Sequence, residues 1–202
     1  MNYLVHLYLS DPDDPCLLGN LMGDFVKGRL DERWPPGITR GIDQHRKIDA
    51  FAHTDATFRR SRERIDGRFG YFRGILVDIF YDHLLARGWQ RHASVDLETF
   101  SARVYRILEE NFALLPEGLK KVAPRMIAHD WLGSYRERDT IARVLERISA
   151  RLSRPNPVAE GMVELERHVA GLEADCDLFL LRAGDYLRRV SEQEEIGKND
   201  PQ

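Results

Sequence analysis

The stretch Gly74-Ile-Leu-Val-Asp-Ile-Phe-Tyr-Asp-His-Leu-Leu-Ala86 decides the fold of this chain. Apolar side chains occur all around a helix placed over it, which predicts a helix buried on most sides. Asp78 and Asp82 are four residues apart and so share one face of that helix, with His83 next to the second. A buried ionised carboxylate costs several kcal/mol unless it is paired. The run contains no Lys or Arg, so its partners are either distant arginines or a divalent cation.

Helical periodicity continues on both sides of this stretch, and no run of alternating strand residues interrupts it. Clusters of Pro and Gly divide the chain into segments. We expect helices over residues 16–28, 38–65, 71–87, 96–115, 136–152 and 158–189. The sequence therefore predicts a single all-α bundle domain over residues 1–202, with a frayed polar tail at 192–202.

Composition excludes several classes of protein. The 202 residues carry 30 Lys and Arg against 33 Asp and Glu, a net charge of −3, which argues against a general nucleic-acid binder. Cys16 and Cys176 have no metal-binding spacing, which favours a reducing compartment. No stretch approaches the roughly 20 apolar residues that span a bilayer, and the N-terminus does not resemble a signal peptide. We expect a cytoplasmic protein without a membrane segment, in an oligomeric state that the sequence leaves open.

Polar side chains also stand in unexpected positions in three earlier segments. His6 lies in the apolar run Asn2–Leu9, and Asp24 follows Leu-Met-Gly. His45 and Asp49 are four residues apart on one helix face. Taken singly, each has an ordinary explanation, namely a hydrogen-bonded core histidine, a turn cap or a surface pair. Because the pattern recurs in four segments, we interpret it as a metal site.

The donor types indicate which metal. Carboxylate oxygens with imidazole suit Mn, Mg or Fe, and the absence of Cys ligands argues against structural zinc. Helical bundles build such centres from side chains that point into the core. The predicted ligands are His6, Asp24, His45, Asp49, Asp78 and Asp82. His53, four residues beyond Asp49, and Asp55 are second-rank candidates.

Four motifs in the same order resemble the acyl carrier protein phosphodiesterases, also called acyl carrier protein hydrolases. They are Met1-Asn-Tyr-Leu-Val-His-Leu-Tyr-Leu9, Gly19-Asn-Leu-Met-Gly-Asp-Phe-Val-Lys-Gly28, Gly41-Ile-Asp-Gln-His-Arg-Lys-Ile-Asp49 and Asp78-Ile-Phe-Tyr-Asp-His-Leu-Leu-Ala-Arg-Gly-Trp89. The resemblance covers roughly the first 90 residues, and four ordered motifs are far more specific than any single one.

The resemblance implies a divergent HD-type phosphohydrolase, all-helical and dependent on a divalent metal, typically Mn. Such an enzyme cleaves 4′-phosphopantetheine from a serine of holo-acyl carrier protein. The resemblance thus implies a role in fatty acid biosynthesis. We expect Asp24 and Asp82 to be catalytic ligands, and His83 to orient them or to protonate the serine alkoxide. One departure concerns Ala52-His-Thr-Asp55, where His53 replaces an expected Asp and Asp55 an expected His. This departure weakens the assignment of Asp55 as a site residue more than it weakens the resemblance to the family.

A basic segment lies between the two groups of predicted ligands. Residues 57–74 contain six Arg against Glu63 and Asp66, a local charge of +4. Because acyl carrier protein is strongly acidic, we expect its binding surface here. The candidate residues are Arg59, Arg60, Arg62 and Arg64. The alternative is an ordinary solvated helix face.

Two other functions fit the same residues. An HD-type nucleotide phosphohydrolase would use the same ligands and hold phosphates with the arginines. A non-catalytic helical binding module would instead pair its buried carboxylates with arginines and need no metal. No phosphate-binding glycine loop or nucleophile motif appears, so other hydrolase chemistries have no support.

Overall fold

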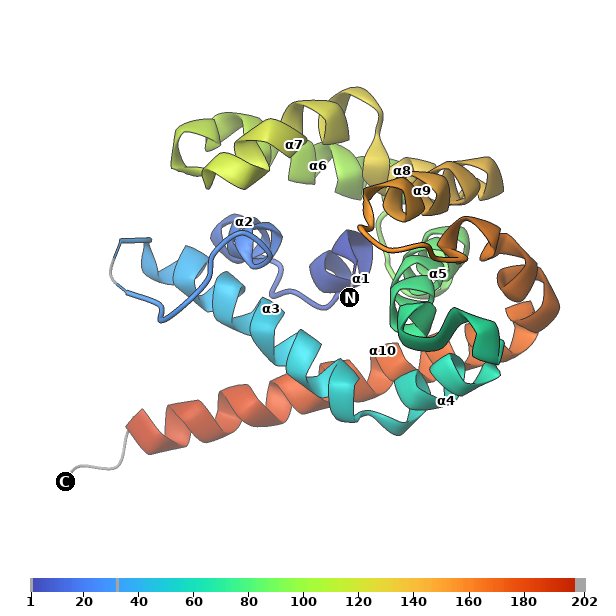
Figure 1. Ribbon diagram of the computed structural model, residues 1–202. Coiled ribbons are helices and arrows are strands. Elements are labelled where there is room, and N and C mark those ends of the chain that lie inside the picture. Colours follow the sequence, from blue (N-terminus) through green and yellow to red (C-terminus); the bar gives the residue numbers. More distant parts are fainter. Residues whose placement is uncertain (1, 32, 199–202) are drawn as a thin grey trace.

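The computed structural model describes residues 2–31 and 33–198, and every regular element in these ranges is helical (Figure 1). The predicted all-α class is therefore confirmed. Short 3₁₀ turns connect several of the helices. The α-helices are α1 (Tyr3–Tyr8), α2 (Asp14–Met22), α3 (Pro36–Thr54), α4 (Ala56–Arg64), α5 (Arg73–Gly88), α6 (Leu97–Glu110), α7 (Glu117–Ala128), α8 (Trp131–Ser134), α9 (Arg138–Arg151) and α10 (Met162–Lys198).

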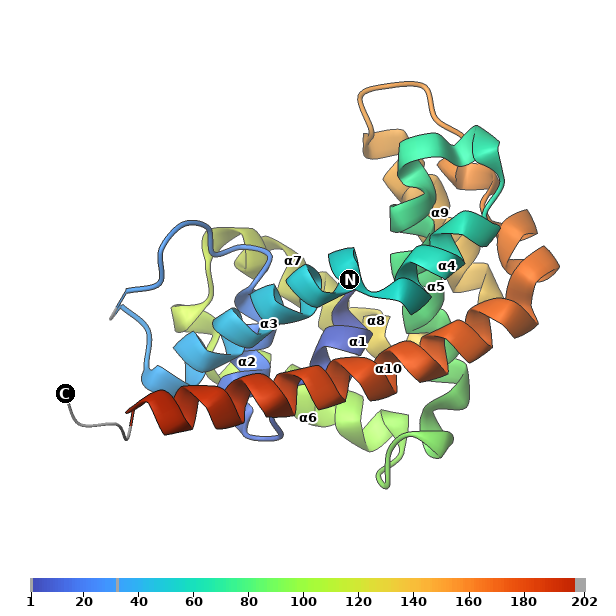
Figure 2. The same ribbon diagram turned by 90° about the horizontal axis from the view of Figure 1, so that it is seen from below.

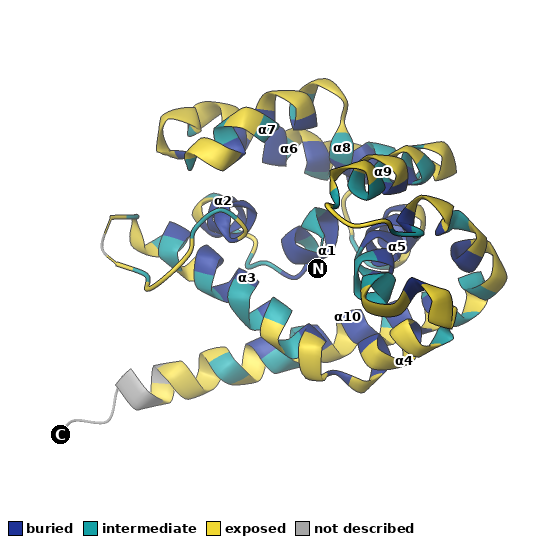
Figure 3. Ribbon diagram, in the orientation of Figure 1, coloured by how far each residue is buried: buried dark blue, intermediate teal, exposed yellow. Residues whose placement is uncertain are grey.

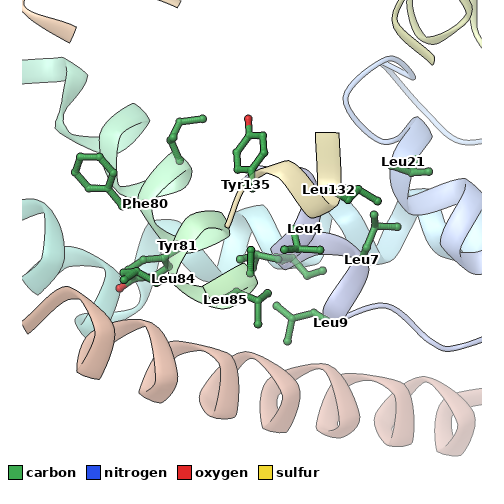
Figure 4. Packing of buried hydrophobic residues seen from close by; sticks show 14 of the residues in the cluster. Leu4, Leu7, Leu9, Leu21, Phe80, Tyr81, Leu84, Leu85, Leu132 and Tyr135 are labelled. Atoms are coloured by element: carbon green, nitrogen blue, oxygen red, sulfur yellow. The ribbon is translucent and has the colours of Figure 1, made fainter. Parts of the chain in front are cut away.

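Helix α1 lies in the middle of the molecule and is buried on nearly all sides (Figures 1 and 3). Its six residues are too few for a helix that is stable by itself, so its conformation depends on its neighbours. Leu4 and Leu7 pack among side chains of α5 and α8, including Leu85 and Leu132 (Figure 4). Helix α1 contacts mainly α5 and α2.

Helices α2 and α3 approach each other closely because Gly41 has no side chain. A Cβ atom at Gly41 would lie 2.1 Å from the carbonyl oxygen of Cys16 on α2. This contact brings the end of α2, and Asp24 just beyond it, beside the second half of α3. The two helices thus form a frame for side chains that face α1.

The prediction of one continuous helix over residues 38–65 is wrong, because the helix is interrupted at Asp55. This residue has extended backbone angles (φ −68°, ψ 135°) and separates α3 from α4. Its side chain accepts hydrogen bonds from the N–H groups of Thr57 and Phe58, which caps the N-terminus of α4. The break turns the basic helix α4 away from the axis of α3 (Figure 2).

Helix α10 is longer than predicted and runs along α3 and α4 (Figure 2). Phe51 on α3 stacks on Tyr186 of α10 with ring centres 4.9 Å apart. Residues 192–198, predicted to fray, continue the helix, since Glu194 pairs with Lys47 on α3. The rest of the predicted tail, 199–202, lies outside the described residues. None of the helices in the described ranges is both long enough and apolar enough to cross a membrane.

Candidate metal centre

Side chains of α1 and α3 converge at the middle of the bundle. The imidazole rings of His6 and His45 stack with their centres 3.8 Å apart and their planes 7° from parallel. His6 Nε2 lies 3.2 Å from Asp49 Oδ1, and His45 Nε2 lies 3.4 Å from Asp49 Oδ2. One carboxylate therefore faces two imidazole nitrogens, and one ligand atom from each of the three residues lies within 4.8 Å of the others.

Asp24 approaches the same centre from the segment after α2. Its Oδ1 lies 3.5 Å from His45 Nε2. The residue before it, Gly23, has to be a glycine, because a Cβ atom there would lie 2.2 Å from Cγ of the His45 ring. Two imidazoles and two carboxylates thus form one cluster, which we call the His–Asp cluster: His6, Asp24, His45 and Asp49.

The His–Asp cluster has a buried side and an open side. The imidazoles of His6 and His45 are only 3% and 4% exposed, whereas the side chains of Asp49 and Asp24 are 39% and 50% exposed. The rings are therefore fixed in the core, and the carboxylates reach solvent. A ligand can approach from the carboxylate side without any rearrangement of the helices.

The spacing and the bonding of these atoms both fit a metal ion. Two ligand atoms at about 2.1 Å from an ion, separated by about 90–110°, lie roughly 3.0–3.4 Å apart, close to the observed 3.2–3.5 Å. His6 Nδ1 and His45 Nδ1 have no hydrogen-bond partner in the described part of the chain, whereas Nε2 of each ring lies against the Asp49 carboxylate. The two Nε2 atoms therefore point to the place where the carboxylates converge, and a cation there would be bound by Nε2 of each ring.

Electrostatics act differently on the members of the cluster: burial acts to lower the pKa of His45, but the carboxylates of Asp24 and Asp49 outweigh it and raise the pKa, so a cation has to displace a proton there. Burial lowers the pKa of His6 to about 4, so this imidazole is neutral near pH 7. Contact with His45 lowers the pKa of Asp24. Burial acts to raise the pKa of Asp49, but the imidazoles of His45 and His6 outweigh it and hold the pKa below its usual range. Both carboxylates are therefore ionised.

Asp82, predicted as a catalytic ligand, has different partners. Its two carboxylate oxygens accept hydrogen bonds from the N–H groups of Leu4 and Val5, both at 2.9 Å. These groups belong to the first turn of α1 and have no acceptor within that helix. Burial raises the pKa of Asp82 to about 7. Asp82 therefore fastens α1 to α5 and so positions His6, and it does not join the His–Asp cluster.

The other two candidates on α5 also lie outside the His–Asp cluster. Burial raises the pKa of Asp78 to about 6, and the negative charge of Asp49 contributes to this rise, so the two carboxylates lie within electrostatic reach. His83 donates a hydrogen bond from Nδ1 to the carbonyl oxygen of Tyr135 at 2.7 Å. This bond ties α5 to the end of α8 and directs that nitrogen to the backbone.

The second-rank ligand candidates and the predicted partner-binding arginines also lie outside the His–Asp cluster. His53 is exposed at the end of α3, and Asp55 caps α4 and pairs with Arg182 at 2.7 Å. Arg60 and Arg64 both bind the buried carboxylate of Asp175 on α10. Of the predicted partner-binding residues, the structure leaves two exposed without an ion pair to any described residue: Arg59 and Arg62.

Sequence reasoning missed two residues beside the cluster. Gly23 makes room for the His45 ring, and Tyr3 lies one turn before His6 on α1. Burial raises the pKa of Tyr3 to about 12, and the charge of Asp24 acts in the same direction. A signal for Tyr3 exists in its three-residue spacing from His6, which places both on one side of α1. No comparable signal identifies Gly23, because its role depends on how α2 and α3 pack.

Comparisons with known proteins identify the family of this chain. The family model for acyl carrier protein phosphodiesterase matches residues 1–182. A protein named acyl carrier protein phosphodiesterase from Escherichia coli O157:H7 (strain EC4115 / EHEC) is 32% identical over 181 residues, covering 86% of this chain and 90% of that protein. Its namesake from Pectobacterium atrosepticum is 32% identical over 169 residues, covering 83% and 88%. No solved structure matches the chain. Because the family model covers most of the chain, this chain belongs to the acyl carrier protein phosphodiesterase family.

Proposed function

We propose that this protein is a metal-dependent phosphodiesterase that releases 4′-phosphopantetheine from the serine of holo-acyl carrier protein. Membership of an enzyme family with that name supports the substrate and the type of bond. The observation that carries the metal dependence is the convergence of His6 and His45 on the Asp49 carboxylate at 3.2 and 3.4 Å. The donor set of nitrogen and oxygen favours Mn, with Mg or Fe as alternatives.

Each residue of the cluster has a defined task in this proposal. A bound divalent cation would lower the pKa of a water ligand and neutralise negative charge on the phosphoryl oxygens. His6 and His45 hold their nitrogen lone pairs in place because their rings are buried and stacked. Asp49 and Asp24 supply negative charge from the solvent side, where the phosphodiester approaches. Asp82 acts indirectly by fixing α1.

The alternative of a non-catalytic binding module has less support. That function requires buried carboxylates paired with arginines, as Asp175 is with Arg60 and Arg64. The buried carboxylate of Asp82 instead accepts two backbone N–H groups. No observation favours a nucleotide over a protein-linked phosphodiester.

Intact-mass spectrometry tests the proposal directly. Holo-acyl carrier protein incubated with the purified enzyme and Mn²⁺ should lose the mass of 4′-phosphopantetheine, and excess EDTA should prevent the loss. His45→Ala should remove the activity, while His53→Ala, on the same helix, serves as the matched control. An unchanged substrate mass with Mn²⁺, Mg²⁺ and Fe²⁺, or undiminished turnover in EDTA, would contradict the proposal. A panel of nucleotides should remain intact under the same conditions.

A further inference from the structure

A hollow lined by Tyr3, one turn before His6 on α1, carries three arginines on one wall. Its volume is about 410 Å³, and it lies between the start of α1, α5, α8 and one face of α9. Tyr3 and Tyr135 line one side. Three exposed side chains of α9 line the other, which we call the α9 stripe: Arg143, Arg147 and Arg151.

The α9 stripe is straight and regular. Its members are four residues apart and therefore share one face of the helix. Each step along the axis is about 6 Å, and the stripe is about 12 Å long. A single phosphate group is too small to contact all of it. Carboxylates repeated every three or four residues along a second helix have the same spacing.

The positive charge of the α9 stripe is not neutralised within the described part of the molecule. None of its arginines forms an ion pair with a described residue, and Arg143 only donates to Thr140 Oγ1 at 3.0 Å. Other arginines do have partners, since Arg138 at the start of α9 binds Glu166. Like charges four residues apart destabilise a helix. An acidic partner would remove this repulsion.

Tyr3 connects the α9 stripe to the His–Asp cluster. It lines the hollow and lies one turn before His6 on α1. The raised pKa of Tyr3 reflects burial first, then Asp24, with Arg151 acting in the opposite direction. Its hydroxyl group therefore lies within electrostatic reach of both the cluster and the stripe. A group attached to a protein bound on α9 would reach the hollow at Tyr3, which lies one helical turn from His6.

We infer that the α9 stripe is the docking surface for an acidic helix of the protein substrate, which places its phosphodiester over the hollow beside Tyr3. The identity of the partner rests on the proposed function, while the surface rests on the spacing and charge of α9. The two exposed arginines of α4, Arg59 and Arg62, are the competing surface.

A pair of double variants separates the two surfaces. Arg143→Glu with Arg147→Glu changes α9, and Arg59→Glu with Arg62→Glu is the control on α4, with the same change in net charge. We would measure kcat and KM on holo-acyl carrier protein, Kd for apo-acyl carrier protein at low and high salt, and turnover of bis(p-nitrophenyl) phosphate. Melting temperatures would verify folding, and Arg147→Glu alone is available if the α9 double variant does not fold.

The α9 variant should raise KM and Kd about tenfold or more, with kcat and turnover of the small diester within about twofold of wild type. The control should change Kd less than about twofold, and the affinity of the wild type should fall with salt. An unchanged Kd in the α9 variant, an equal rise in the control, or no binding of apo-acyl carrier protein by the wild type would overturn the docking surface. Binding that depends on α9 without cleavage would instead contradict the proposed function alone.

Discussion

Helices α3 and α5 each carry two potential metal ligands four residues apart, but they satisfy these side chains in opposite ways. On α5, the Asp82 carboxylate accepts two backbone N–H groups at 2.9 Å and fastens another helix. On α3, His45 and Asp49 meet the imidazole of His6, and the rings keep buried nitrogens without hydrogen bonds. A buried polar residue is thus explained by the groups that face it. Where backbone donors face it, its role is structural, and where other ligands face it, a cation fits.

The largest expected difference concerns activity. His45→Ala or Asp49→Ala should each lower kcat/KM by on the order of 10³-fold, because each removes a ligand from the centre. Helical content by circular dichroism should stay close to wild type, since α3 contacts α2 and α10 along most of its length. Near-normal turnover in either variant would show that the cluster is not the reaction centre. In a titration, Mn²⁺ should bind more weakly to either variant than to wild type.

Asp82→Ala should mainly affect stability. Two buried backbone N–H groups would lose their acceptors, which costs about 2–3 kcal/mol and lowers the melting temperature by roughly 4–12 °C. Asp82→Asn, which keeps one acceptor, should recover part of this loss. Urea unfolding in EDTA measures the effect without a contribution from bound metal. If Asp82→Ala leaves stability unchanged but removes Mn²⁺ binding, Asp82 is a ligand after all.

His6 and Asp82 should respond to pH with opposite signs. His6 has a folded pKa of about 4 against 6.5, so only the unfolded chain is protonated in between, and stability is lost as pH falls through this window. Asp82 has a folded pKa of about 7 against 3.8, so its contribution is lost as pH rises towards 7. Each slope is at most about 1.4 kcal/mol per pH unit. In EDTA, Asp82→Asn should therefore make stability rise more steeply between pH 4.5 and 6.5 than in wild type, and an identical slope would contradict this assignment.

The smallest effect is expected at the exposed end of α3. His53→Ala should change the free energy of unfolding by less than about 0.5 kcal/mol and kcat/KM by less than about twofold. The residue is exposed and lies outside the cluster, although it follows His45 by two helical turns and Asp49 by one. A tenfold loss of activity would mean that the centre extends further along α3 than the geometry indicates.

The all-α fold and the four residues that meet in the His–Asp cluster could be predicted from the sequence. Periodicity locates most helices, and the apolar surroundings of His6 and the spacing of His45 and Asp49 identify residues that meet in space. The role of Asp82 could not be predicted, because it depends on where α1 ends up relative to α5. In the same way, Arg60 and Arg64 look free until Asp175, more than 100 residues later, packs against them.

Local signals also misled in two places. Asp55 resembles part of a continuous His and Asp face, yet it acts as the N-cap of α4, a function that Asp commonly has. The expected helices include none between residues 115 and 136, yet Pro116 is the N-cap of α7 and Pro124 lies in the second half of that helix.

The hydrogen bonds between Asp82 and α1 have a consequence for the order in which the protein is made. Helix α1 leaves the ribosome before α5, and the carboxylate that fastens it is 78 residues further along the chain. All four residues of the His–Asp cluster are therefore synthesised well before His6 can be held in place. A nascent or truncated chain that stops before α5 contains the complete ligand set and still lacks the means to assemble it.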